Sequence, residues 1–270
     1  MVIVIDIGSH QTLIGLFDDS NVLIKKINFK TPINYQQFLI RLEENIVKNS
    51  TITNSLTRGI IGISADFDIN KNFIFTCLGL PWKNTLIVSD IEKITNCPLL
   101  LENNTLLAGL YESTINYPDQ NKKILYLSIG NTVKHCLITN NKIKSDTKAD
   151  RNNIIIEKSG KAVSWDKLIS GRSIIERFSN LAKNIKDETI WKAYAQELAQ
   201  GLWELNAVYQ PDTIIIGGTI GQYFNEYKDF LNEELKKYIL PIVPLPNIIR
   251  ATKPFSNVLF GGNLFITQNY

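Results

Sequence analysis

The chain has 270 residues, of which 44% are hydrophobic and 20% are charged, and its formal net charge is +3. This composition is that of a globular protein able to build one large or two ordinary cores, and it excludes disorder as the main state. The basic residues form no long runs, so nucleic acid is not an expected partner. The sequence shows neither a secretory leader nor an apolar run of membrane-spanning length, which predicts a cytoplasmic protein with no membrane partner.

The first part of the chain predicts a meander of strands followed by alternating helices and strands. Residues 2–5, 12–17 and 22–27 are strand-like runs joined by short polar turns, which indicates three consecutive antiparallel strands. Phe38, Leu42 and Ile46 are spaced four residues apart, which predicts a helix over residues 35–48, and a strand is expected over 59–64. A capping-box pattern at Ser89 and Glu92 predicts the start of a short helix. A strand at 98–101 and a helix entered through a polar turn follow.

Two segments of the sequence have the same pattern. Residues 2–19 read VIVIDIGSHQTLIGLFDD and residues 124–141 read ILYLSIGNTVKHCLITNN. Each has an apolar strand, a small polar residue, Ile-Gly, a short polar turn, a second strand and two polar residues. This repetition predicts an internal duplication. We therefore expect an N-terminal α/β domain over residues 1–117 and a C-terminal α/β domain over 118–270, with a terminal helix at about 256–268 packing on the first domain.

The second half predicts mainly helices, with one buried strand. Short helices are expected over residues 165–169 and after Gly171, and the strand over 213–216. An amphipathic helix over 223–238, a strand near Ile248 and a helix after Pro254 complete it. A long helix over 187–209 places an apolar stripe toward the core. The stripe consists of Trp191, Tyr194, Leu198, Leu205 and Val208.

Three strand ends carry the residues typical of a nucleotide site. Asp6 and Gly8 end the first strand, and a carboxylate beside a glycine suits hydrated Mg²⁺ and the close approach of phosphate to the backbone. Gly130 repeats that turn in the second half, and Gly217 and Gly218 end a later strand. Together they predict a nucleotide held between two similar domains.

Several segments resemble the ROK family (repressor, open reading frame, kinase) of sugar kinases, and the resemblance covers nearly the whole chain. It implies a two-domain α/β fold of the actin-like and hexokinase-like ATPases, built from duplicated ribonuclease H-like domains. Since no helix-turn-helix segment precedes the first strand, the repressor branch is disfavoured. The matching segments are residues 62–68 (GISADFD, for Gly-Val-Pro-Gly-Pro-Val-Asp), 80–84 (LPWKN, for Asn-Leu-Pro-x-Trp), 102–104 (ENN, for Glu-Asn-Asp) and 170–174 (SGRSI, for Ser-Gly-Arg-Ala-Ile).

The resemblance also implies a set of site residues. ATP and Mg²⁺ are the implied cofactors, with Asp6 as the Mg²⁺-side carboxylate, and a homodimer is the implied assembly. The implied nucleotide-binding residues are Gly8, Ser9, His10, Gly130, Asn131, Thr132, Gly217, Gly218 and Thr219. The implied sugar-binding residues are Ser64, Ala65, Asn103, Asp150 and Asn153.

The sequence departs from the family at the position of the catalytic base. In the family kinases the Asp of Glu-Asn-Asp removes the proton from the sugar hydroxyl, and here Asn104 occupies that place. An amide has no basic site of useful pKa, and losing a general base costs about 10²- to 10⁴-fold in rate. Ser9 and His10 also replace a glycine and a threonine of the first phosphate turn.

The sequence departs from the family at its zinc motif as well. The Glu-x-Gly-His sugar and zinc motif is best matched by residues 150–153, which lack the histidine, and the family's cysteine cluster is missing, so no zinc site is expected. His10 and His135 are better explained by chance pairing or surface location than by metal binding. Asp66 and Asp68 are expected to shape a hairpin, although either is also a candidate replacement base.

Three functions fit these observations. The first is an ATP-dependent carbohydrate kinase acting on a hexose or amino-hexose hydroxyl, with weak activity. The second is a catalytically inactive sugar sensor or interaction protein of the same fold. The third is a kinase of the same superfamily that acts on a substrate other than a sugar.

Overall fold

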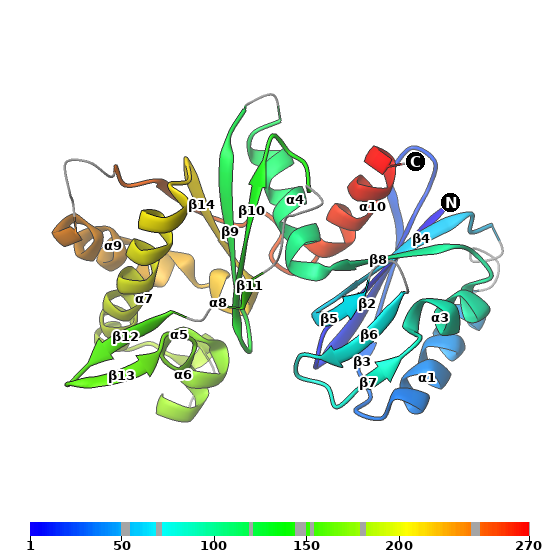
Figure 1. The fold of residues 1–270 in the computed structure, drawn as a ribbon, viewed down its shortest axis with the longest axis horizontal. Helices are drawn as coiled ribbons and strands as arrows, with labels where there is room; N and C mark the ends of the chain where they lie inside the picture. Colours follow the sequence, from blue (N-terminus) through cyan, green and yellow to red (C-terminus); the bar gives the residue numbers. More distant parts are fainter. Residues whose placement is uncertain are drawn as a thin grey trace. The chain divides into compact units, whose positions relative to one another are not determined.

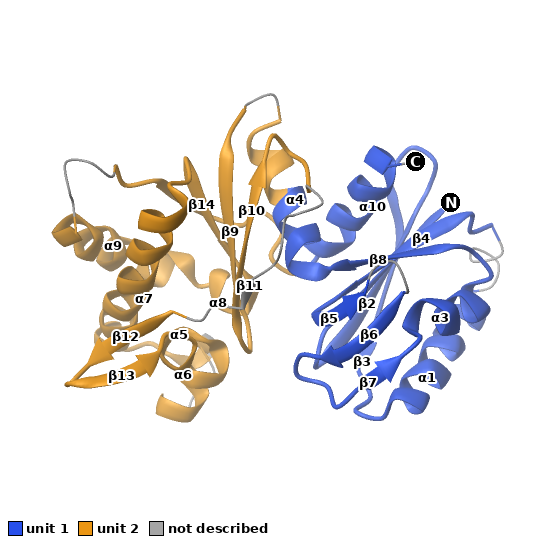
Figure 2. Cartoon of the chain, in the orientation of Figure 1, with its two compact units in different colours: residues 1–111, 256–270 blue, residues 112–255 orange. Residues whose placement is uncertain are grey.

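The computed structural model describes residues 1–49, 55–68, 72–118, 121–143, 150–151, 154–178, 182–238 and 244–269. The chain forms two compact units, which Figure 2 shows in different colours. Unit 1 contains residues 1–111 and 256–270, and unit 2 contains residues 112–255. Unit 1 is therefore assembled from both ends of the chain. None of the described helices is long and apolar enough to cross a membrane.

Unit 1 is built on a five-stranded mixed sheet with the order β3-β2-β1-β4-β8. The predicted meander is confirmed, because β1, β2 and β3 pair antiparallel, and β4 and β8 then continue parallel to β1. Figure 1 shows these strands with the helices that connect them. The bounds are β1 Val2–Ile7, β2 Gln11–Phe17, β3 Leu23–Lys30, α1 Tyr35–Val47, β4 Arg58–Ile63, α3 Ile87–Thr95, β8 Leu99–Asn103, α4 Asn104–Asn116 and α10 Asn257–Asn269.

Different helices cover the two faces of this sheet, because successive side chains of a strand point to opposite sides. The alternate isoleucines of β1 belong to a core that includes residues of α1 and α3; they are Ile3, Ile5 and Ile7. The other face meets α10, where a Cβ on Gly262 would lie 2.5 Å from Cγ1 of Val4. Asp6 alternates with Ile5 and Ile7, so it lies on the α10 face at the carboxyl end of β1.

A small antiparallel sheet follows β4 in the chain and consists of β5 Ala65–Asp68, β6 Phe73–Cys77 and β7 Lys83–Thr85. The expectation that Asp66 and Asp68 shape a hairpin is confirmed, and Thr76 Oγ1 donates a hydrogen bond to Asp66 Oδ2 at 2.9 Å. Trp82 is buried beside this sheet, and its Nε1 donates to Ile33 O at 2.8 Å. It anchors the core of unit 1.

Unit 2 has a second five-stranded sheet with the order β11-β10-β9-β14-β15, and helices α5, α6, α7 and α9 contribute to its main core. Its strands are β9 Lys123–Ile129, β10 Val133–Thr139, β11 Asp150–Arg151, β12 Ile155–Lys158, β13 Lys161–Ser164, β14 Thr213–Gly217 and β15 Asn247–Arg250. Its helices are α5 Asp166–Ile169, α6 Gly171–Phe178, η1 Ala182–Asn184, α7 Glu188–Tyr209, α8 Gly218–Gly221, α9 Phe224–Leu235 and η2 Lys236–Tyr238.

The two large sheets have equivalent topologies, which confirms the duplication. The β1–β2 hairpin of unit 1 corresponds to β9–β10 of unit 2, and in each unit the next strand lies parallel to the first. The turns differ in length, since residues 8–11 lie between the paired Ile7 and Thr12, whereas only residues 130–132 lie between the paired Ile129 and Val133. The ungapped alignment of the two segments is therefore one residue out of register after the turn.

Two local predictions are wrong. The pattern at Ser89 is no capping box, because α3 already begins at Ile87 and Ser89 Oγ donates back to Leu86 O at 3.2 Å. The helix starts early because Ile87 and the residue after it are buried in the core. In α7, Val208 is 70% exposed instead of buried. The buried face of the last turn passes through Leu205 and its neighbour, so Val208 points to solvent.

Candidate active site

The carboxyl ends of three parallel strands carry the candidate residues of unit 1. The register places β1, β4 and β8 level with one another, with Ile7 opposite Ile63 and Ile63 opposite Asn103. Asp6 and Asn104 meet on this edge, where Asn104 Nδ2 donates to Asp6 Oδ1 at 3.3 Å. The amide of Asn104, which is predicted to replace the general base, thus donates to the strand-end carboxylate.

The two adjacent asparagines have different local contacts. Asn103 Oδ1 accepts a hydrogen bond from Thr105 N at 2.9 Å, as a cap does at the start of a helix. Gly62 on β4 lets two helices approach the sheet, because a Cβ there would lie 3.0 Å from Leu107 Cδ1 of α4 and from Val258 Cγ1 of α10. The sequence offered no signal for Gly62 as a spacing residue.

Glu102 precedes them as a buried carboxyl. It is 8% exposed, and Oε1 accepts from Asn103 N at 2.6 Å. Burial raises the pKa of Glu102, which this backbone hydrogen bond partly offsets. The residue stabilises the junction between β8 and α4 and thereby the direction of the asparagines.

The turn at residues 8–11, the first predicted phosphate turn, is fixed by Thr31, the residue that follows β3. Gly8 N donates to Gln11 O at 3.1 Å across the turn, and a Cβ on Gly8 would lie only 2.9 Å from the same oxygen. Thr31 Oγ1 donates to Gly8 O at 2.7 Å, and Thr31 N donates to His10 O at 3.0 Å. Both carbonyls are therefore directed toward β3.

The side chains of Ser9 and His10 lie next to each other on this turn. Ser9 Oγ is 3.1 Å from His10 Nδ1, and His10 is exposed. Gly79, at φ +81°, approaches the turn so closely that its Cβ would lie 3.0 Å from Ser9 Cβ. Gly79, the residue before the segment that resembles Asn-Leu-Pro-x-Trp, thus packs on this turn.

Removal of the Thr31 hydroxyl is expected to loosen this turn. Thr31→Val keeps the shape of the side chain but removes the hydroxyl. The carbonyl of Gly8 and the hydroxyl of Thr12, which lies 2.9 Å from Thr31 Oγ1, both lose a hydrogen-bond partner. We expect a loss of about 1–3 kcal/mol in the free energy of unfolding, measured by urea denaturation. Thr31→Ser, which retains the hydroxyl, should lose less. Equal stability of Thr31→Val and the parent chain would contradict this.

Ser64 and Ala65 connect the main sheet to the small one. Ser64 is buried and its carbonyl accepts from Leu78 N at 2.8 Å and from Cys77 Sγ at 3.6 Å. Ala65 is half-buried and pairs with Cys77 in the hairpin. Both residues follow directly from the carboxyl end of β4.

Unit 2 gathers its candidate residues at the ends of β9 and β14. Gly217 lies against Tyr126, whose hydroxyl would be 2.3 Å from an added Cβ. Gly218, at φ +76°, lies over the backbone of Ile129, where an added Cβ would meet backbone atoms at 2.6–2.7 Å. Only glycine fits this left-handed position. Thr219, in the following turn α8, is exposed.

The second phosphate turn, residues 130–132, lies beside these glycines. Gly130 N donates to Thr132 O at 3.1 Å, and Gly130 O accepts from Gly171 N at 2.8 Å. Asn131 is exposed and Thr132 is half-buried. Three segments far apart in the sequence therefore meet within unit 2: this turn, the start of α6, and the glycines that follow β14.

The last two predicted sugar-binding residues lie in unit 2 or outside the described residues, and the histidines are predicted not to bind metal. Asp150 lies in β11 of unit 2, opposite His135, and Asn153 lies outside the described residues. His135 is buried on β10 and lies 3.1 Å from the Tyr209 hydroxyl, so the expectation of a surface position is wrong for it. Within the described ranges, no group of three or more His, Cys, Asp or Glu is arranged to hold a metal ion.

The two similar α/β units have the fold of the hexokinase-like ATPases. A sequence model described as the ROK family matches residues 2–149 and 151–266. The chain belongs to the ROK family. Comparison with curated protein sequences gives no match.

Solved structures share this fold at low sequence identity. A ROK family glucokinase from Streptomyces griseus, in complex with glucose and AMPPNP, has a TM-score of 0.82 at 14% identity, with 99% of each chain covered. A ROK hexokinase from Thermus thermophilus has a TM-score of 0.76 at 19% identity, covering 100% of this chain and 99% of that one. A ROK family transcriptional regulator homologous to the Escherichia coli MLC protein has a TM-score of 0.81 at 14% identity, covering 99% of this chain and 77% of that one. The fold is thus common to kinases and regulators.

Proposed function

We propose that the protein is a carbohydrate kinase of low turnover, which binds a hexose or amino-hexose at the strand ends of unit 1 and transfers the γ-phosphoryl group of ATP to a sugar hydroxyl. The observation that carries this proposal is the hydrogen bond between Asp6 and Asn104 at the carboxyl ends of the parallel strands β1, β4 and β8. The family and its sugar kinase structures support it.

Each residue of this edge has a distinct role in the proposal. Asn103 is fixed by the helix cap through Oδ1, so its Nδ2 group is the donor it offers to a sugar hydroxyl. Asn104 holds Asp6 in position through their hydrogen bond. The side chain of Ser64 and the backbone at Ala65 border the sugar at the end of β4.

Asp6 fits the requirements of a magnesium-side ligand. Mg²⁺ keeps most of its waters and needs one or two carboxylates together with substrate phosphates. Asp6 is half-buried at a strand end, and its Oδ1 is oriented by the Asn104 amide. This amide is neutral, so it leaves the negative charge of Asp6 available to Mg²⁺. When bound, the ion neutralises charge on the phosphates during transfer.

The proposed rate is low because the site lacks the usual general base. The Asn104 amide cannot accept the proton of the sugar hydroxyl, so the rate depends on the alignment of the two substrates. We assign the nucleotide to unit 2, with the turn at residues 130–132 for the phosphates and Gly217 and Gly218 for the adenosine side.

ATP turnover over a panel of hexoses and amino-hexoses, with calorimetric binding of each ligand, tests the proposal. Slow formation of a sugar phosphate above the rate without protein supports it. Turnover only with substrates other than sugars assigns the protein to another kinase activity, and absence of both turnover and binding contradicts the proposal.

A second candidate function is an inactive sugar sensor or interaction protein. The amide at position 104 favours it, since binding does not require a base. Tight sugar binding without any sugar phosphate formed, in the presence of Mg²⁺ and ATP, would establish this function over the kinase.

A bound sugar is expected to protect Cys77 from alkylation. Cys77 is half-buried beside Ser64, whereas the other two cysteines, Cys97 and Cys136, are buried, so labelling of the native chain should report mainly Cys77. A saturating hexose should slow its reaction with iodoacetamide by about tenfold, which corresponds to an occupancy of roughly 90% under simple binding. Peptide mass spectrometry identifies the labelled site. An unchanged rate with a sugar that binds by calorimetry would place the sugar elsewhere.

A further inference from the structure

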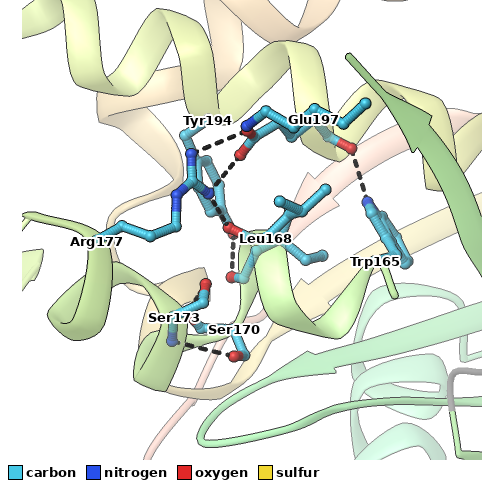
Figure 3. Close-up of polar contacts among 9 residues, drawn as sticks. Trp165, Leu168, Ser170, Ser173, Arg177, Tyr194 and Glu197 are labelled. Carbon is cyan, nitrogen blue, oxygen red and sulfur yellow. Dashed lines mark hydrogen bonds and ion pairs between the residues drawn. The ribbon is translucent and has the colours of Figure 1, made fainter. Parts of the chain in front are cut away.

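Three consecutive carbonyl groups, at residues 168–170, each accept a hydrogen bond from a side chain (Figure 3). Helix α5 has a single turn, and the last carbonyls of a helix have no partner within it. Side chains of α6 and α7 supply donors here, and the carbonyl of Ser170, the residue after α5, also accepts from Ile174 N at 3.1 Å. The bonds are Arg177 Nη1 to Leu168 O at 2.6 Å, Tyr194 OH to Ile169 O at 3.1 Å and Ser173 Oγ to Ser170 O at 2.9 Å.

Arg177 is itself held by a buried carboxylate on α7. Glu197 is 6% exposed and accepts from Nη1 of Arg177 at 2.6 Å and from Nη2 at 2.9 Å, a forked pair with fixed geometry. Lys158 pairs with the same carboxylate, and Trp165 Nε1 donates to the carbonyl of Glu197 at 2.7 Å. Because a buried carboxylate without its cations is strongly destabilising, the direction of Arg177 is well determined.

The segment fixed in this way lies next to the second predicted phosphate turn, residues 130–132, in space. The next residue, Gly171, donates its N–H to Gly130 O at 2.8 Å. The contact is close, since a Cβ on Gly171 would lie 3.2 Å from that oxygen. Gly130 is also bonded through its own N–H to Thr132 O, so both of its backbone polar groups are engaged.

We infer that Arg177, Tyr194 and Ser173 are positioning residues that act through the Gly171 amide to set the affinity of the Gly130 turn for a nucleotide polyphosphate. The inference rests on the proposed function, which assigns a nucleotide to this turn. A turn already held in its bound conformation loses less freedom when the phosphates bind. Side chains remote from the turn thus help to hold Gly130 in place through the Gly171 amide.

Tyr194 and Tyr227 provide a matched pair of variants. Both are fully buried, and their ring centroids are 5.2 Å apart. The Tyr194 hydroxyl bonds to Ile169 O, whereas the Tyr227 hydroxyl has no hydrogen-bond partner among the described residues. Both substitutions remove a buried hydroxyl. Tyr194→Phe also removes the hydrogen bond to residues 168–170, whereas Tyr227→Phe removes no hydrogen bond among the described residues.

Calorimetric titration of the full chain with Mg²⁺ and AMPPNP tests the inference. Tyr194→Phe is expected to weaken AMPPNP binding about five- to tenfold, the usual effect of losing one buried hydrogen bond. Tyr227→Phe should bind as the parent chain does, and neither variant should change the affinity for a sugar. Ser173→Ala, which removes the donor closest to Gly171, should weaken AMPPNP binding in the same way.

Amide hydrogen exchange at Gly171, measured without ligand, separates this inference from the proposed function. Exchange should quicken about tenfold in Tyr194→Phe and stay unchanged in Tyr227→Phe, because local opening sets the exchange rate. Faster exchange with unchanged AMPPNP affinity would overturn the inference, as would unchanged exchange. If the parent chain binds no AMPPNP, the nucleotide-binding role proposed for the Gly130 turn is overturned. The exchange result would still decide whether Tyr194 holds the Gly171 amide.

Discussion

Asn104→Asp is expected to raise the rate of sugar phosphorylation by about 10²- to 10⁴-fold, the usual contribution of a positioned general base. The substituted side chain has the same shape, and its position at the edge of β8 is set by the junction with α4. Initial rates with the best sugar of the panel, at saturating ATP, measure the effect. A variant that binds both substrates and shows no gain would contradict the proposed geometry.

The pH dependence of this variant follows from the contact with Asp6. Asn104 Nδ2 lies 3.3 Å from Asp6 Oδ1, so the substitution places a second carboxylate against the first. Repulsion between the two raises the pKa at which the pair gains a proton. Only the ionised base is active, so the rate should be low at acid pH and rise through that raised pKa.

Asn103→Asp is the control for charge, and its rate is measured at saturating sugar because the substitution also removes the Nδ2 donor proposed for the sugar. It adds the same negative charge one residue earlier, and its oxygen is still able to accept from Thr105 N, as Asn103 does at 2.9 Å. This variant should show no gain in rate at any pH. A gain equal to that of Asn104→Asp would mean that charge near the site, and not a base at position 104, limits the reaction.

Gly261→Ala is expected to destabilise unit 1 by about 3 kcal/mol or more because of a steric conflict. Alanine favours a helix by about 1 kcal/mol relative to glycine, and this gain is too small to offset the conflict. Its Cβ would lie 1.8 Å from Leu107 O, a backbone atom of α4 that no side-chain rotation can move away. Helix α10 would have to shift off the sheet. Thermal unfolding followed by circular dichroism should show a Tm lower by about 6–12 °C.

Gly130→Ala is the control for this substitution. The nearest atom to its added Cβ is Thr132 O at 3.9 Å, an ordinary contact. Its Tm should stay within about 1–2 °C of the parent, as expected for a substitution without steric conflict. A Tm of Gly261→Ala equally close to the parent would show that α10 does not pack against α4 through Gly261.

The sequence predicted the strands and the duplication because both rest on local patterns. Apolar runs such as residues 2–5 and the repeated Ile-Gly turn need no tertiary information. Helix boundaries depend on packing, which is why Ile87, a core residue, starts α3 before the polar pattern at Ser89. The exposure of Val208 has the same origin, because only the structure shows where the buried face of α7 ends.

The candidate site shows a similar limit. Asp6 and Asn104 were each predicted as site residues, and their contact over 98 positions of sequence is seen in unit 1. Their roles stay predictions, as do those of Asp150 and Asn153. Thr31 was missed, because nothing local at the end of β3 indicates that its hydroxyl bonds to Gly8. Arg177 and Tyr194 were missed for the same reason.

The split of unit 1 between the two ends of the chain has a consequence for biosynthesis. Helix α10 leaves the ribosome after every residue of unit 2, yet it covers the sheet face that carries Val4 and Ile60. That apolar face is therefore exposed for most of translation, while unit 2 is continuous and completes its own core first. Nascent chains stalled before residue 256 should bind chaperones through unit 1, and release of the last helix should end that binding.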